Sequence, residues 1–278
     1  MFGSLRNVAS AILASVMLVA TPAAANDRDR CATASGDIAI AACTAVIETS
    51  NQSGKNLATA FFNRGIVFLT RGRTLNDKGD MERAFADYDR AIADFDLAIR
   101  NDPKNPRSFY YRGRAHSLKG GNEGFQRAIA DYSEAIKLDP NYKVALERRG
   151  EAYMITRDFD NIIVNYNALI RLGPRNSDNF YFRGEAHREK GNFERALADY
   201  NQAIGLDRKN FQAIHGRGLV DEAKGDLNRA ILDYSAAIKL CRDFIGCYLY
   251  YGDRARVYRA KGDVDHAVAD ETEAKRGR

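Results

Sequence analysis

The chain has 278 residues, of which 42 are lysine or arginine and 37 are aspartate or glutamate, so its formal net charge at pH 7 is +5. The basic residues alternate with acidic ones along the whole chain and gather in no stripe or patch, so a nucleic-acid partner is not expected.

A cleavable signal segment is predicted at residues 1–25. Arg6 supplies one early positive charge, the apolar run VASAILASVMLVA follows at 8–20, and Ala23 and Ala25 form a small-residue cleavage signature. The apolar run is too short to favour spanning a bilayer, and no second one follows, so we expect no membrane insertion. We therefore expect a periplasmic or secreted protein, with no lipid anchor because no cysteine directly follows the cut.

The four cysteines lie in two local pairs, Cys31 with Cys43 and Cys241 with Cys247. Four cysteines allow three connectivities, and an oxidising compartment favours disulfides. Neither pair has the CxxC spacing and no histidine lies beside them, so zinc binding or redox catalysis is the weaker interpretation. We predict two local disulfides.

One unit repeats along the chain. RGRAHSLKG (112–120), RGEAYMITR (149–157), RGEAHREKG (183–191) and RGLVDEAKG (217–225) correspond, and each is followed by a segment similar to RALADYNQAIGLD. A glycine recurs in the first helix of each unit, with steps of 48, 37, 34 and 34 residues; these glycines are Gly65, Gly113, Gly150, Gly184 and Gly218.

A helix–turn–helix unit with a 34-residue period resembles the tetratricopeptide repeat. The resemblance covers nearly all of residues 26–278 and implies an all-α, right-handed superhelical solenoid of stacked hairpins with a concave inner face. Each second helix carries one narrow apolar stripe, and stacking buries these stripes continuously. We divide the chain into a partial N-terminal repeat at 31–54 and repeats at about 56–104, 105–141, 142–175, 176–209, 210–243 and 244–278.

The first full repeat is longer than the others. From Gly65 to Ala91 is 26 residues, against 12 from Gly184 to Ala196, and the inner turn places seven extra residues on each side of Gly79. Seven residues are about two helical turns. We therefore expect both helices of this hairpin to project two turns beyond the stack.

The N-terminal segment 35–47 fits the second helix of a repeat, with Cys43 in the position that Tyr200 has in the fourth repeat. Cys31 would then lie on a short first helix. A disulfide between them would close this truncated end and stabilise it by roughly 2–4 kcal/mol on a loop-entropy account.

An arginine precedes the glycine position in six repeats, and an acid or amide recurs in each paired second helix. An anion-binding column is one interpretation, but we predict that each arginine pairs within its own repeat and fixes the register of the two helices. The predicted pairs are Arg64 with Asp94, Arg112 with Asp131, Arg149 with Asn165, Arg183 with Asp199, Arg217 with Asp233, and Arg254 with Asp270.

The stretch FRGEAHREKG (182–191) brings Glu185, His187, Arg188 and Glu189 into about one helical turn, which suggests acid–base chemistry. His187 nevertheless occupies a position where related repeats carry aromatic residues, so we interpret it as packed between helices. No GxSxG, HExxH or P-loop sequence is present. We expect no enzyme activity, no cofactor and no metal site.

In tetratricopeptide proteins the first helices line the groove, at positions three before, one after and four after the glycine. The resemblance makes the following residues candidates for binding a partner: Phe62, Tyr110, Arg114, Glu151, Tyr181, Glu185, Arg188 and His215. Aromatic residues among arginines suit recognition of a protein or peptide. The lysine–asparagine pattern of the members that bind chaperone tails is absent, so carboxylate clamping is not implied.

The leading hypothesis is a non-catalytic periplasmic scaffold or adaptor that binds a segment of another protein in its concave groove. The alternative is a structural solenoid of the cell envelope that self-associates through its C-terminal repeat, where Val264, Ala267 and Val268 would form the stacking face. An enzyme or carbohydrate-handling factor is a third class, disfavoured because no convergent site is visible.

Overall fold

The computed structural model describes residues 22–49, 54–241 and 246–276, and within these ranges the chain forms fourteen α-helices and no strand. The helices are α1 (Pro22–Thr33), α2 (Gly36–Thr49), α3 (Lys55–Asp77), α4 (Met81–Asn101), α5 (Pro106–Lys119), α6 (Gly121–Leu138), α7 (Lys143–Thr156), α8 (Phe159–Leu172), α9 (Ser177–Glu189), α10 (Phe193–Leu206), α11 (Phe211–Ala223), α12 (Leu227–Leu240), α13 (Cys247–Ala260) and α14 (Val264–Arg276).

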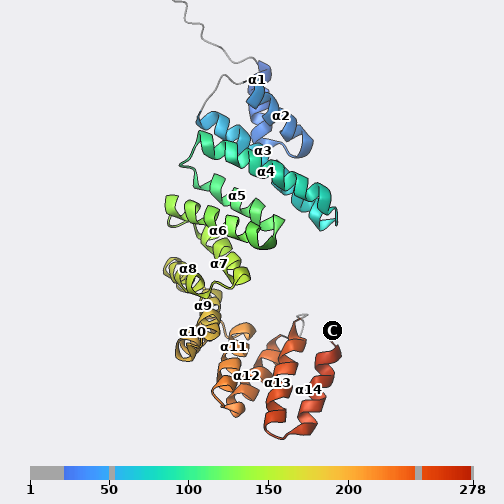
Figure 1. The fold of residues 1–278 in the computed structure, drawn as a ribbon, viewed down its shortest axis with the longest axis vertical. Coiled ribbons are helices and arrows are strands. Elements are labelled where there is room, and N and C mark those ends of the chain that lie inside the picture. Colours follow the sequence, from blue (N-terminus) through green and yellow to red (C-terminus); the bar gives the residue numbers. More distant parts are fainter. Residues whose placement is uncertain (1–21, 50–53, 242–245, 277–278) are drawn as a thin grey trace, which may run out of the picture.

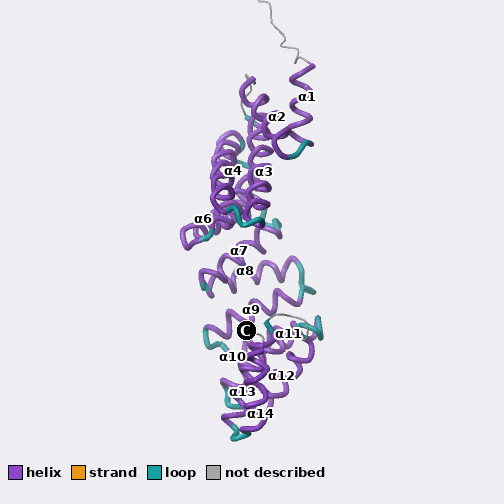
Figure 2. The backbone as a smooth tube through the Cα atoms, turned by 90° about the vertical axis from the view of Figure 1, so that its right-hand side faces the viewer, coloured by secondary structure: helices purple, strands orange, loops and turns teal. Residues whose placement is uncertain are grey.

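Consecutive helices pair into antiparallel hairpins that stack from α1–α2 at one end to α13–α14 at the other (Figure 1). Helices α3 and α4 cross the long axis of the molecule, whereas α13 and α14 run closer to it, so the helix direction turns along the stack. Figure 2 shows the same succession of hairpins from the side. The predicted all-α solenoid is confirmed.

The five hairpins from α3–α4 to α11–α12 each close around a glycine and an aromatic ring. A Cβ atom added at Gly184 would lie 2.9 Å from Cε1 of Tyr200, whose side chain is fully buried. At Gly65 the corresponding atom would lie 2.8 Å from the ring of Phe95. Glycine is therefore required at this position in these five hairpins, because a side chain there would press on the ring and push the two helices apart.

The six predicted arginine pairs are confirmed, one in each hairpin from α3–α4 to α13–α14. In the fourth repeat, Nε of Arg183 donates to Oδ2 of Asp199 at 2.9 Å and Nη2 donates to Oδ1 at 2.5 Å. Arg149 makes one such bond, to Oδ1 of Asn165 at 2.9 Å. The other four arginines each hold both oxygens of the predicted aspartate.

The same arginines also join neighbouring hairpins, which the sequence did not suggest. Nη1 of Arg183 donates to Oδ1 of Asn167 on the preceding second helix at 2.6 Å. In five of the six cases the acceptor lies two residues after the acid or amide of the preceding repeat. In chain order the acceptors are Thr44, which follows no such residue, and then Asp96, Ser133, Asn167, Asn201 and Ser235. This arginine ladder therefore uses up its guanidinium groups internally and is not an open anion site.

The long α3–α4 hairpin contains the ladder contact twice. Helices α3 and α4 have 23 and 21 residues, whereas α9 and α10 have 13 and 14, so the predicted extension is confirmed. Seven residues after Arg64, Arg71 holds both oxygens of Asp87 at 2.6 and 2.8 Å and reaches Asp37 on α2 at 2.7 Å. Two helical turns have thus been added together with a complete second set of contacts.

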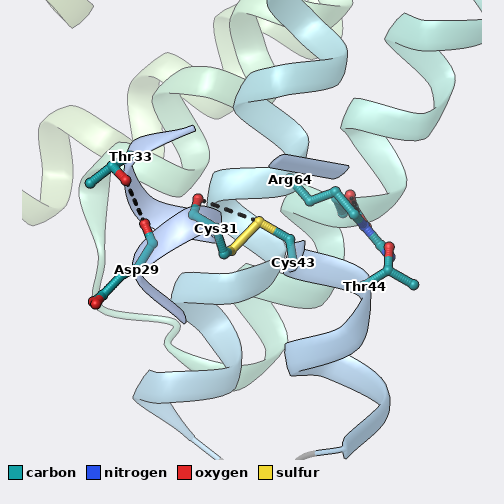
Figure 3. Close-up of a disulfide and its surroundings, with 7 residues drawn as sticks. Asp29, Cys31, Thr33, Cys43, Thr44 and Arg64 are labelled. Atoms are coloured by element: carbon teal, nitrogen blue, oxygen red, sulfur yellow. Dashed lines mark hydrogen bonds and ion pairs between the residues drawn. A yellow bond between two sulfur atoms is a disulfide. The ribbon is translucent and has the colours of Figure 1, made fainter. Parts of the chain in front are cut away.

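The first hairpin, α1–α2, is held by the disulfide between Cys31 and Cys43, with sulfur atoms 2.06 Å apart (Figure 3). Nearby, Arg64 of α3 donates to Thr44 of α2 at 2.9 Å, which ties this hairpin to the next one. Cys241 and Cys247 form the second disulfide, next to the segment 242–245 that lies outside the described residues. Both predicted pairings are confirmed.

The predicted signal segment lies largely outside the described residues, which begin at residue 22. Within the described ranges no helix is both long and apolar enough to cross a membrane. One detail of the predicted C-terminal stacking face is wrong. Ala267 is fully buried inside the last hairpin because it packs against α13, whereas Val264 and Val268 are 53% and 48% exposed.

Candidate functional site

The first helices of the hairpins lie on the inner side of the stack. Helix α5 contacts both α3 and α7, and α9 contacts α11, whereas within the described chain no two successive second helices pack together as extensively. Helices on the inside of a curved stack are closer together than those outside. The eight predicted binding residues all lie on first helices. Their burial and contacts decide which of them a partner could reach.

Phe62 and Tyr110 lie in the core rather than on an open surface, and each is only 8% exposed. Tyr111 explains part of this burial, because its ring centroid lies 5.5 Å from that of Phe62 and 5.0 Å from that of Tyr110. Tyr142, which precedes α7, covers Tyr110 from the other side at 5.3 Å. A partner would therefore meet the edge of an aromatic cluster at this end of the inner face.

Arg114 and Glu151 are more accessible. The guanidinium of Arg114 lies over the rings of Tyr111 and Tyr110, at 5.6 and 6.0 Å from their centroids. Glu151 has 54% of its side chain exposed and accepts hydrogen bonds from Nη1 of Arg148 at 2.7 and 3.1 Å. Both side chains are accessible to solvent and could therefore contact a partner.

Tyr181, Glu185 and Arg188 come together on α9. Glu185 accepts a hydrogen bond from the hydroxyl of Tyr200 and another from Nη2 of Arg188 at 3.0 Å. Burial, followed by the charge of Glu185, raises the pKa of both Tyr181 and Tyr200, so both hydroxyls stay protonated across the physiological range. Nε of Arg188 is buried and has no hydrogen-bond partner within the described chain.

His215 of α11 reaches the next hairpin. Its Nε2 lies 2.7 Å from Oδ2 of Asp253, and its ring stacks on Tyr250 with centroids 4.0 Å apart. Burial by itself would raise the pKa of Asp253, but the hydrogen bond to His215 and the charges of His215 and Arg256 hold that pKa below its usual value. His215 thus ties α11 to α13, and only 14% of its side chain is exposed.

A cleft of about 490 Å³ opens beside these residues. Two of its lining residues, Glu222 and Arg256, form a two-point ion pair at 2.7 and 2.9 Å. The cleft is lined by Arg188, Glu189, Phe193, Leu219, Glu222, Ala223 and Arg256. It combines a half-buried apolar floor with paired charges, which suits binding of a protein segment more than a small ion.

Of the eight predicted binding residues, only Arg188 lines this cleft. Arg256 was missed, although it lies directly after Ala255, which takes the glycine position in the last repeat. That position is the signal that could have found the pair, because the residue one after the glycine position and the residue four after it are both expected to line the groove.

The acid–base interpretation of residues 182–191 gains no support. His187 is 7% exposed, and its Nδ1 has no hydrogen-bond partner within the described chain. Burial and three neighbouring basic side chains lower its pKa against the opposing effect of Asp199, so the ring is held neutral. The described residues contain no group of three or more potential metal ligands.

Two family models match the chain, one described as "TPR repeat" at residues 184–223 and one described as "Tetratricopeptide repeat" at residues 76–121. Comparison with curated proteins gives no match.

Solved structures with the same arrangement of helices are numerous. MamA is 25% identical over 59% of this chain and 93% of that protein, with a TM-score of 0.52. YrrB, described as a TPR protein with an unusual peptide-binding site, is 20% identical over 66% and 92%, with a TM-score of 0.50. PilW, described as a widely conserved type IV pilus biogenesis factor, is 14% identical over 75% and 91%, with a TM-score of 0.58. At such identities the similarity to YrrB and PilW concerns the fold alone.

Proposed function

The chain is a tetratricopeptide repeat protein, and from this premise we propose that it is a non-catalytic scaffold that binds a segment of another protein along its inner face. The observation that carries the proposal is the cleft formed by α9, the start of α10, α11 and α13, where the half-buried Leu219 and Phe193 lie among paired charges. The ladder arginines, by contrast, are saturated by contacts within the solenoid. The peptide-binding site for which YrrB is described agrees with this use of the fold.

Affinity capture from the native envelope tests the proposal. Leu219→Arg adds a fifth charged side chain to the lining of the cleft. The control is Leu232→Arg on the outer helix α12, where the leucine is 69% exposed. We expect the first variant to lose the captured partner and the second to retain it. Identical partners from both variants would contradict binding in the cleft.

We further propose that the protein acts in the periplasm or outside the cell. The predicted signal segment supports this, and so do the two disulfides, which form and persist in oxidising compartments. Fractionation combined with mass analysis of the mature N-terminus tests this proposal. A cytoplasmic protein that retains residues 1–25 would contradict it.

A self-associating solenoid is the second candidate, supported by Val264 and Val268 on the outer face of α14. Val264→Ser with Val268→Ser should then lower the mass measured by light scattering at high concentration. A wild-type protein that is already monomeric under these conditions would remove this candidate.

A further inference from the structure

Two arginines on the inner face have no acidic partner. Arg107 and Arg114 both belong to α5, and neither makes an ion pair with any carboxylate of the described chain. Other arginines of this face differ, because Arg148, Arg188 and Arg256 each bind at least one carboxylate. The two arginines lie over aromatic rings instead, with Arg107 at 5.0 Å from the ring centroid of Phe62 and Arg114 at 5.6 Å from that of Tyr111.

Ring contacts leave the hydrogen-bonding edges of a guanidinium free. A guanidinium that lies over an aromatic ring gains an electrostatic attraction and a defined plane, but its N–H groups still need acceptors. Arg107 is exposed and Arg114 is half-buried, so both can be reached from solvent. Carboxylates match the fork of N–H donors that arginine presents, and two such bonds can form at once.

The inner face is also polarised along its length. Near α5 and α7 it carries four basic side chains against two acidic ones, and near α9, α11 and α13 it carries two basic side chains against four acidic ones. The first group is Arg107, Arg114, Lys143 and Arg148 with Glu147 and Glu151. The second group is Arg188 and Arg256 with Glu185, Glu189, Glu222 and Asp253.

We propose that Arg107 and Arg114 bind an acidic segment of the partner protein, seated against the edge of the aromatic cluster. The two arginines are seven residues apart on one helix, which corresponds to about 10 Å along its axis. A segment in the extended polyproline II conformation covers about that length in three residues and brings every third side chain to the same face. The segment therefore carries two carboxylates about three residues apart with an apolar residue between them. This inference rests on the proposed function. The excess of acidic side chains near α9, α11 and α13 would attract a basic part of the same partner and so fix its direction along the inner face.

Synthetic peptides test the proposal even though the partner is unidentified. The acidic probe is a fluorescent ten-residue peptide with two glutamates three residues apart around one phenylalanine, in a glycine–serine background. A second probe has lysines in place of the glutamates. We expect the full-length protein to bind the acidic probe at least about tenfold more tightly by fluorescence anisotropy, and increasing salt to weaken that binding.

Three variants make the result specific. Arg107→Gln with Arg114→Gln should weaken the acidic probe by about tenfold or more, because charge-assisted hydrogen bonds are lost. Arg171→Gln with Arg195→Gln removes the same charge from exposed positions of the outer helices α8 and α10 and should change nothing. Arg107→Glu with Arg114→Glu should invert the preference toward the lysine probe, which unfolding could not produce.

Equal affinity of the two probes, or equal loss in the α5 pair and in the control pair, would overturn the proposal. If partner capture depends on Leu219 while the probes are not discriminated, this inference fails and the proposed function stands. If capture does not depend on Leu219, the proposed function itself fails.

Discussion

Arg183 holds both carboxylate oxygens of Asp199, with its Nε and Nη2 at 2.9 and 2.5 Å, while its third nitrogen reaches the neighbouring hairpin. The side chain of Asp199 is 7% exposed and that of Arg183 is 22% exposed, so this pair is largely withdrawn from solvent. One side chain therefore sets the register within a hairpin and the spacing between hairpins.

Asp199→Ala should lower the free energy of unfolding by about 2 kcal/mol, because it leaves a half-buried guanidinium without its acceptor. Urea denaturation measures the change. The matched control is Glu123→Ala, which breaks an exposed pair with Arg127 at 2.5 Å and should cost less than about 0.5 kcal/mol. Equal effects of the two substitutions would show that the ladder contributes no more than a surface ion pair.

Two glycine substitutions should have opposite signs. Gly184→Ala places a Cβ atom 2.9 Å from the buried ring of Tyr200 and should destabilise by about 1–3 kcal/mol. Gly205 lies in α10, and a Cβ atom added there would have no neighbour within 4 Å, so Gly205→Ala should stabilise by roughly 0.5–1 kcal/mol. Thermal unfolding of both variants measures this, and a tolerated alanine at 184 would refute the close contact.

His116 and His187 should make the solenoid less stable as the pH falls. Burial is the largest cause that lowers the pKa of each, so the unfolded chain binds protons at a higher pH than the folded one. This contribution is fully present above the unfolded pKa of about 6.5 and declines as the pH falls through it. Replacement of both by phenylalanine, which Phe68 shows to fit this position, should flatten the change between pH 7.5 and 5.5 in urea titrations. An unaltered slope in the double variant would exclude these two rings as the cause.

Loss of the first disulfide should loosen α1 and α2 more than the rest of the stack. Cys31→Ala with Cys43→Ala is expected to lower the local stability by about 2–4 kcal/mol. Because the contacts of a repeat array are mostly between neighbours, the effect should fade along the chain. Hydrogen exchange measures it, with faster exchange in α1–α2 and unchanged exchange in α9–α10. Uniform acceleration would mean that the array unfolds as one unit.

The repeat period was enough to predict the hairpins, the two added turns of α3 and α4, and the arginine partners within each repeat, because each of these depends on contacts between positions a fixed distance apart. The second copy of the ladder contact, between Arg71 and Asp87, was not predictable in this way. It follows the contact of Arg64 after seven residues rather than 34. The period also places Phe62 on the inner face without showing that Tyr111 covers it. Exposure depends on the size of the neighbouring side chains, which position within a repeat does not determine.

Site-specific photocrosslinking in the native envelope tests binding on the inner face most directly. A photoreactive phenylalanine derivative would replace Leu219 in the cleft or Leu232 on the outer face of α12. Our account predicts that position 219 crosslinks to a defined partner protein and that position 232 gives no crosslink to it. The reverse pattern, or the same products from both positions, would contradict it.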